Sequence, residues 1–66
     1  MPSWSVVRAG RGFMPELLYR GRLLQRADAA YERYKDEPDT VTTLYYHGDC
    51  GRIVLRSTLE EAANVG

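Results

Sequence analysis

Thirty-one consecutive residues, 9–39, contain no valine, isoleucine or threonine. The β-branched residues lie before this window, at Val6 and Val7, and after it, from Thr40 onward. β-branched side chains are stiff at χ1 and favour strands, whereas Leu, Ala, Arg, Glu and Gln lose little freedom in a helix. The partition therefore predicts a strand, a helix and a hairpin, in that order along the chain.

The extent of the central helix depends on Gly21. The lack of β-branched residues favours a single helix over about 15–36, in which the glycine costs roughly 1 kcal/mol. In the alternative, Glu16–Leu24 is a strand or an irregular hairpin partner of Trp4–Arg8, and the helix starts near Gln25. The neighbouring glycines favour this alternative because glycine is free to take a positive φ. Both alternatives predict a helix over Ala27–Asp36.

Apolar residues recur at three- and four-residue spacing within that helix, which predicts the face that packs on a sheet. The stripe consists of Leu24, Ala27, Tyr31 and Tyr34, widened by Leu23 and Ala30.

Two runs near the C-terminus, Thr40–His47 and Arg52–Arg56, predict a hairpin. The tip between them is rich in turn residues, and Gly48-Asp49 resembles a primed turn. Ile53 and Leu55 alternate with polar or solvent-facing positions, so they are expected to face the core while the other face of the strand is solvated and basic.

Thr58 and Glu61 match a capping box and predict a short C-terminal helix to about Asn64. The expected fold is thus a single α+β domain over residues 1–66. Its mainly antiparallel sheet has three or four strands and is packed by one central helix. A core of this size supplies little stability, so a homodimer is possible.

Composition argues against several classes of protein. The single cysteine, Cys50, excludes an internal disulfide, and no apolar run near 18 residues or signal-peptide pattern occurs. A cytoplasmic protein with no membrane association is expected. His47, Asp49 and Cys50 share the hairpin tip, but the chain is too small to add an oxyanion hole and a cleft. The sequence therefore predicts no enzyme, no cofactor and no metal, and leaves any role for His47 and Cys50 open.

The formal net charge is zero, but the two parts of the chain carry opposite charges. Residues 1–26 hold five arginines and one glutamate, a net charge of +4, and residues 27–66 hold four basic and eight acidic side chains, a net charge of −4. Such asymmetry can mark a surface for nucleic acid or for an acidic partner. Nucleic-acid binding is the alternative function, and its site would comprise Arg8, Arg11, Arg20, Arg22 and Arg26. The zero net charge and the acidic second part argue against it.

Charges of one sign line up along the predicted helix, although like charges at four-residue spacing are slightly destabilising. This pattern favours a docking face over a surface tuned for stability, and charged faces set orientation and association rate. Tyr46 is a candidate exposed anchor, because tyrosine is favoured at interface hot spots. The predicted partner-binding residues are Arg22, Arg26, Arg33, Asp28, Glu32, Asp36 and Tyr46.

A compact, arginine-rich, charge-polarised chain with spare aromatic residues resembles the small proteins that phages and mobile elements make to bind host machinery, anti-CRISPR proteins among them. The resemblance is one of type and no motif carries it. It implies a non-enzymatic inhibitor or modulator that occupies a surface of a host protein or protein complex.

Overall fold

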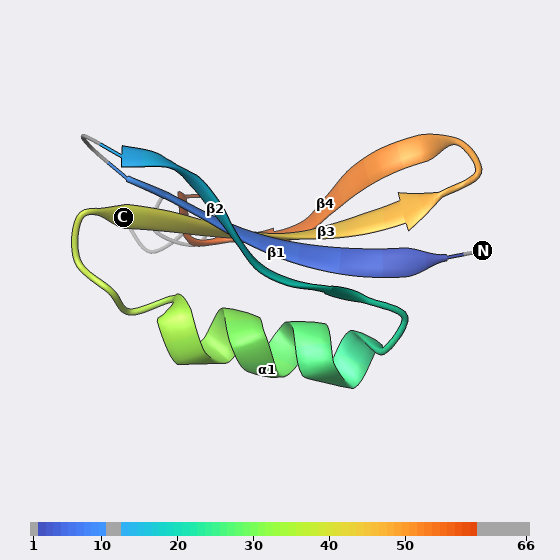
Figure 1. Ribbon diagram of the computed structural model, residues 1–66, viewed down its shortest axis with the longest axis horizontal. Helices are drawn as coiled ribbons and strands as arrows, with labels where there is room; N and C mark the ends of the chain where they lie inside the picture. The colour runs from blue at the N-terminus through green and yellow to red at the C-terminus, as the bar shows by residue number, and fades with distance from the viewer. Residues whose placement is uncertain (1, 11–12, 60–66) are drawn as a thin grey trace.

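A computed structural model describes residues 2–10 and 13–59, which form four strands and one long helix (Figure 1). The elements are β1 (Ser3–Gly10), β2 (Phe13–Gly21), α1 (Leu24–Tyr34), β3 (Thr40–Gly48) and β4 (Gly51–Ser57). The strands make one antiparallel sheet in the order β2-β1-β3-β4, and α1 packs on one face of it. This confirms the predicted α+β class and resolves the number of strands to four.

The two central strands, β1 and β3, hold the sheet together. They pair without a register shift from Ser3 opposite His47 to Gly10 opposite Thr40. Alternate side chains of a strand point to opposite faces, so Val6 and its partner Leu44 both face α1. There they meet two fully buried helix residues to form the core, which consists of Val6, Ala27, Tyr31 and Leu44.

β2 occupies the segment for which the sequence favoured a continuous helix, and that prediction is wrong. The alternative, a strand paired with β1, is correct, although the strand already begins at Phe13. β2 is an edge strand, which tolerates Pro15 because its outer N–H positions need no ladder partner. A register shift places Leu18 as an extra residue, and both Leu18 and Tyr19 pack against the core. Tertiary packing thus overrides the helical propensity of this leucine-rich segment.

Two strands end in the pattern Tyr-x-Gly, and in each the tyrosine ring lies over the glycine. A Cβ at Gly21 would overlap the Tyr19 hydroxyl, and a Cβ at Gly48 would lie 2.9 Å from the Tyr46 ring. Trp4 pairs with Gly21 on one side and with Tyr46 on the other, where the ring centroids are 5.6 Å apart. The glycines therefore leave room for an aromatic layer at this end of the α1 side of the sheet.

α1 begins at Leu24, so the predicted start near residue 15 is wrong and the alternative start near Gln25 is correct to within one residue. It ends at Tyr34 instead of continuing to Asp36, and Asp39 in the following loop has a positive φ of 60°. Ala27 and Tyr31 are fully buried, which confirms the centre of the predicted stripe. Leu23 and Leu24 are exposed, contrary to prediction, because the helix only begins there.

The β3–β4 hairpin is confirmed, but its turn differs from the predicted primed turn. Asp49 and Cys50 connect the strands, and the residue with a positive φ is Gly51, at 109°. A primed turn needs a positive φ at a central turn position. Neither Asp49 nor Cys50 has one, so the prediction is wrong.

The prediction that Ile53 and Leu55 face the core is also wrong, because α1 lies over β1, β2 and β3 and not over β4. In addition, a register shift between Leu44 and Tyr45 inserts one residue into β4.

The predicted C-terminal helix falls largely on residues 60–66, which lie outside the described part, as does Glu61 of the capping box. Thr58 and Leu59 are described. The Thr58 hydroxyl accepts a hydrogen bond from the Thr42 N–H at 3.0 Å, and the Ser57 hydroxyl accepts one from the Leu59 N–H at 3.3 Å. The first of these contacts fastens the residue after β4 to β3.

Candidate functional site

The outer edge of β4 carries three consecutive exposed apolar residues. Ile53, Val54 and Leu55 follow one another and are 55%, 45% and 47% exposed. Ile53 pairs with Tyr46 on the α1 side of the sheet, and Val54 pairs with Tyr45 on the opposite side. An edge strand presents unpaired backbone N–H and C=O groups, so this apolar strand is open to a further strand.

A groove runs between β4 and the N-terminal half of α1. It has a volume of about 420 Å³. Its apolar lining comes from Leu24, Leu44 and Leu55, and its polar lining comes from Gln25, Asp28 and Arg56. We call the exposed apolar residues of β4 and of the start of α1, Leu24, Ile53, Val54 and Leu55, the β4 surface.

Arg56 closes one side of the groove by linking β4 to α1. Its guanidinium donates hydrogen bonds to Asp28 and Glu32, both at 2.9 Å, and lies 4.2 Å from the centre of the Tyr31 ring. Glu32 also forms an ion pair with Lys35 at 2.8 Å. The hydrogen bonds from Lys35 and then Arg56 lower the pKa of Glu32, and the bond to Glu32 raises the pKa of Lys35. Two of the three predicted acidic residues are therefore partly neutralised within the fold.

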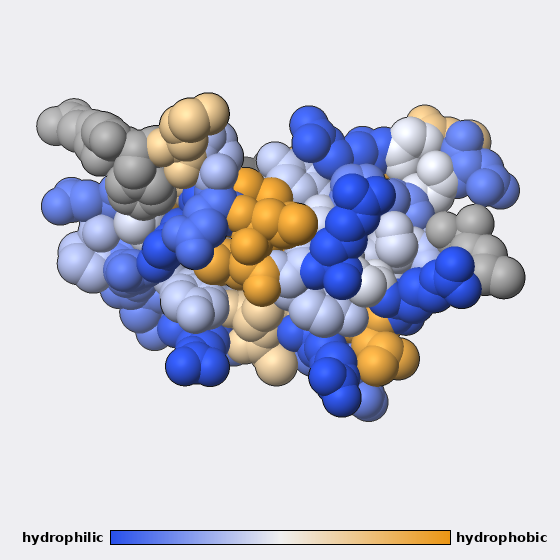
Figure 2. All heavy atoms as spheres, viewed as in Figure 1, coloured by the Kyte–Doolittle hydropathy of each residue, from blue (hydrophilic) through white to orange (hydrophobic). Residues whose placement is uncertain are grey.

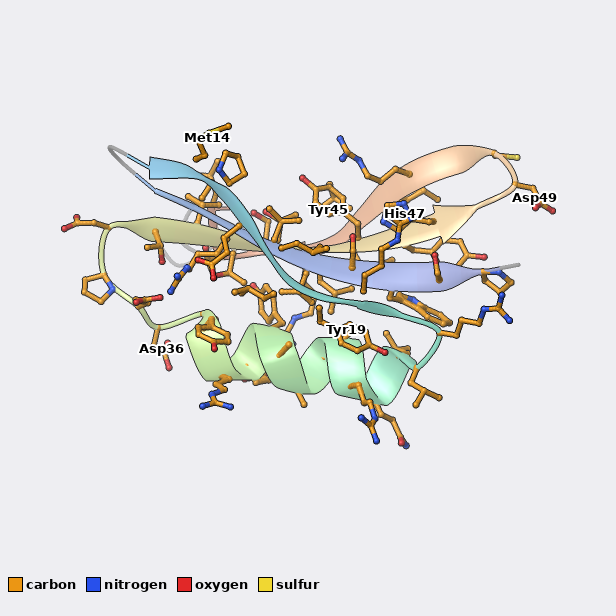
Figure 3. The ribbon with its side chains drawn as sticks, in the orientation of Figure 1. Met14, Tyr19, Asp36, Tyr45, His47 and Asp49 are labelled. Atoms are coloured by element: carbon orange, nitrogen blue, oxygen red, sulfur yellow. The ribbon has the colours of Figure 1, made fainter. Side chains whose placement is uncertain are left out.

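Asp36, the third predicted acidic residue, is exposed just beyond the end of α1 (Figure 3). The predicted arginines Arg22, Arg26 and Arg33 are also exposed, and none of them forms an ion pair within residues 2–10 and 13–59. At 100° per residue, Arg26 and Arg33 lie on the side of α1 away from β4. The helix thus presents carboxylates toward β4 and guanidinium groups on its other side.

Tyr46 is half-buried and already has structural contacts, since its ring lies beside Trp4 and over Gly48. It meets the β4 surface through Ile53, its partner in the ladder.

Hydrophobic side chains also gather over the middle of β2, where Leu17 is exposed (Figure 2).

The face of the sheet opposite α1, which we call the open face, carries a second group of side chains. Tyr45 and His47 point away from α1 (Figure 3), and their rings are 6.3 Å apart. Arg52 lies with its guanidinium carbon 4.4 Å from the centre of the Tyr45 ring, and Ser5 Oγ is 2.7 Å from His47 Nε2. Arg20 is the β2 partner of Ser5, which itself pairs with Tyr45. We call Arg20, Tyr45, His47 and Arg52 the open-face cluster.

Acidic side chains are absent from the open face in the described strands. The one acidic residue in any of the four strands is Glu16, and it lies on the α1 side, where it forms an ion pair with Arg8 at 2.6 Å. Sequence reasoning missed this cluster because it summed charge along the chain. The sequence does contain a signal for the cluster. Tyr45 and His47 are two residues apart, Arg52 directly follows the predicted turn, and neither of the two predicted strands contains an acidic residue.

The arginines of the predicted nucleic-acid site do not gather on one surface of the described residues. Arg8 forms ion pairs with Glu16 and Glu37 and lies 5.4 Å from the centre of the Tyr34 ring. Hydrogen bonds to Glu16 and then Glu37 raise the pKa of Arg8 further. Arg20 lies on the open face, Arg22 precedes α1, Arg26 lies in the first turn of α1, and Arg11 is outside the described part.

The hairpin tip offers little chemistry. The His47 ring is hydrogen-bonded to the Ser5 hydroxyl, and Cys50 is exposed in the turn. Within the described ranges, no group of three or more His, Cys, Asp and Glu side chains is placed to hold a metal ion. In the same part of the chain, no helix combines the length and apolar composition that crossing a membrane requires.

Comparison with protein-family models, with curated proteins and with solved structures finds no match. Function is therefore inferred from the residues of this chain alone.

Proposed function

We propose that this protein is a non-enzymatic binding module that docks an extended segment of a partner protein against β4. The partner segment adds a fifth strand to the sheet and places apolar side chains beside the groove. The observation that carries the proposal is the outer edge of β4, which pairs with no other strand of the described residues and where Ile53, Val54 and Leu55 are all about half exposed. Strand addition takes its affinity from backbone hydrogen bonds and its specificity from pockets for alternate side chains.

The contrast between the two edges of the sheet supports this choice. β2, the other edge, carries Pro15 and Glu16, and proline and charge are features that discourage pairing with another chain. The exposed stretch of β4 carries neither, although arginines flank it. Soluble domains keep such apolar edges when a partner covers them.

The charges around β4 indicate which partner segment fits. Arg52 is exposed at one end of the strand, and β3 and β4 contain no acidic residue. Arg56, at the other end, is occupied by Asp28 and Glu32. An apolar segment with a carboxylate that reaches Arg52 is therefore the complementary partner.

The exposed charges of α1 supply orientation. Arg22, Arg26 and Arg33 would accelerate association with an acidic surface of the partner, whereas the apolar edge would set the lifetime of the complex. An inhibitor or adaptor acting on a host protein complex needs both properties and no catalytic group.

Photo-crosslinking tests the proposal. A benzophenone amino acid at position 53 should crosslink a specific host protein, and the same group at Leu17, an apolar β2 residue with similar exposure (58%), should not. With the purified partner, Ile53→Glu should abolish binding measured by calorimetry, and Leu17→Glu should retain it. Amide hydrogen exchange should show new protection along β4 in the complex.

Three outcomes would contradict the proposal. These are equal crosslinking from both positions, partner binding that survives Ile53→Glu, and a concentration-dependent dimer of this chain that protects β4 by itself. Both variants should keep the thermal midpoint of the parent, because the replaced side chains are largely exposed.

A further inference from the structure

The open face has a chemistry distinct from that of the β4 surface. Its charged side chains are the guanidinium groups of Arg20 and Arg52, and its most prominent planar groups are the rings of Tyr45 and His47. Within the described residues, the acids lie elsewhere: in the α1 layer, in the α1–β3 loop, at Glu16 on the α1 side, and at Asp49 in the hairpin turn (Figure 3). Among the described residues, the open face therefore carries positive charge and attracts anions, although the net charge of the chain is zero.

The planar groups of the cluster are held in place before any ligand arrives. Arg52 is stacked on Tyr45, with 4.4 Å between the guanidinium carbon and the ring centre, and the hydrogen bond to Ser5 orients the His47 ring. Ser5 is buried beneath these groups. A guanidinium or aromatic plane that is already fixed loses little entropy when a base stacks on it.

The layout of the cluster suits a chain of phosphates and bases. Arg20 lies on one edge strand and Arg52 on the other, with Tyr45 and His47 on β3 between them. Neighbouring strands are about 4.8 Å apart, so the cluster spans roughly 15 Å across the sheet. Sheet surfaces of this extent stack two or three bases of a single strand.

We propose that the open face binds single-stranded nucleic acid, with Arg20 and Arg52 on phosphates and with Tyr45 and His47 against bases. A duplex is a poorer fit, because its bases are already stacked and two arginines give little backbone affinity. This site differs from the nucleic-acid site predicted from the sequence. That site includes Arg8, which already forms ion pairs with Glu16 and Glu37.

The salt dependence follows from the number of cations. Two phosphate contacts on a single strand give a slope of log K against log salt of about −1.4. Affinity should therefore fall about 7-fold between about 50 and about 200 mM salt. Removing either arginine should halve that slope.

Fluorescence anisotropy with a labelled oligothymidylate of about ten nucleotides tests the site. Arg52→Gln and Arg20→Gln should each weaken binding and halve the salt slope, and Tyr45→Leu should weaken it roughly 5- to 150-fold without changing the slope. Arg26→Gln is the matched control, since it removes an arginine on α1 that is also exposed and should change neither quantity.

Several results would overturn the proposal. They are no binding at about 50 mM salt, an equal loss of affinity in Arg26→Gln, and equal binding of a duplex of the same length or of polyglutamate. Circular dichroism of each variant shows whether it is folded. If Tyr45→Leu does not fold, Arg52→Gln still tests the site. Arg52 belongs to both proposed sites, so Ile53→Glu separates them: this residue lies on the α1 side of the sheet, and its replacement should keep oligonucleotide binding while it abolishes protein docking.

Discussion

Replacing Leu44 with alanine should cost about 3 kcal/mol of unfolding free energy. Leu44 is 1% exposed and packs with Val6, Ala27 and Tyr31 in a very small core. Leucine to alanine removes three carbons, worth about 2.4 kcal/mol of transfer free energy, and the cavity left behind adds to this. Because Leu44 also borders the groove beside β4, neighbouring groups and water can partly fill the space, which places the cost low in the usual range of about 2–5 kcal/mol.

The size of this effect relative to total stability makes it decisive. A chain of 66 residues is stabilised by roughly 3–10 kcal/mol, so Leu44→Ala should remove a large part of the total. Leu55→Ala is the matched control: this side chain is 47% exposed, and its loss should cost about 1 kcal/mol.

Urea unfolding measures both variants. Trp4 is the single tryptophan and packs against Tyr46 in the sheet, so its fluorescence reports loss of tertiary structure, and circular dichroism reports the helix. The two probes should give one transition with an unchanged m-value. An equal cost for Leu44→Ala and Leu55→Ala would refute the assignment of the core to the α1 side of β3.

Three further changes test other contacts. The pKa of Glu32 is lowered, chiefly by its hydrogen bond from Lys35. The Glu32 carboxylate therefore stabilises the fold above its ordinary pKa, and this stabilisation is lost as pH falls through the lowered value. Between about pH 5 and about pH 3, Glu32→Gln should lose less thermal stability than the parent. Gly21→Ala should destabilise the fold in urea because its Cβ overlaps Tyr19, and a double-mutant cycle with Tyr19→Ala should recover most of that loss. Asp39, at a φ of 60°, should tolerate glycine without loss, whereas Asp39→Val should cost about 1–2 kcal/mol in the same assay.

The sequence predicts the parts of the fold in which local preference and tertiary packing agree. The runs that became β3 and β4 combine β-branched residues with a turn, and Ala27 and Tyr31 keep helical spacing in the centre of α1. β2 is different, because its leucines and arginine favour a helix and become a strand by pairing with β1. No local pattern encodes that pairing, so the sequence alone does not distinguish the strand from the helix at this segment.

The candidate sites were harder to predict than the fold. Helical spacing correctly separates the acidic and basic rows of α1, yet it cannot show that Arg56 comes across from β4 to bind Asp28 and Glu32. Nor can it show that α1 stops short of β4 and leaves Ile53 exposed. Both features depend on where the helix sits across the sheet, which is a long-range property.

A single inserted residue in β4 explains why its two arginines act on different layers. Arg52 and Arg56 are four residues apart, so in a regular strand they would share one face. The register shift opposite Leu44 and Tyr45 reverses the alternation between them. Arg56 therefore turns toward α1 and neutralises its carboxylates, while Arg52 stays on the open face with Tyr45. In a regular strand one of these contacts would be lost, because both arginines would compete for the same side of the sheet.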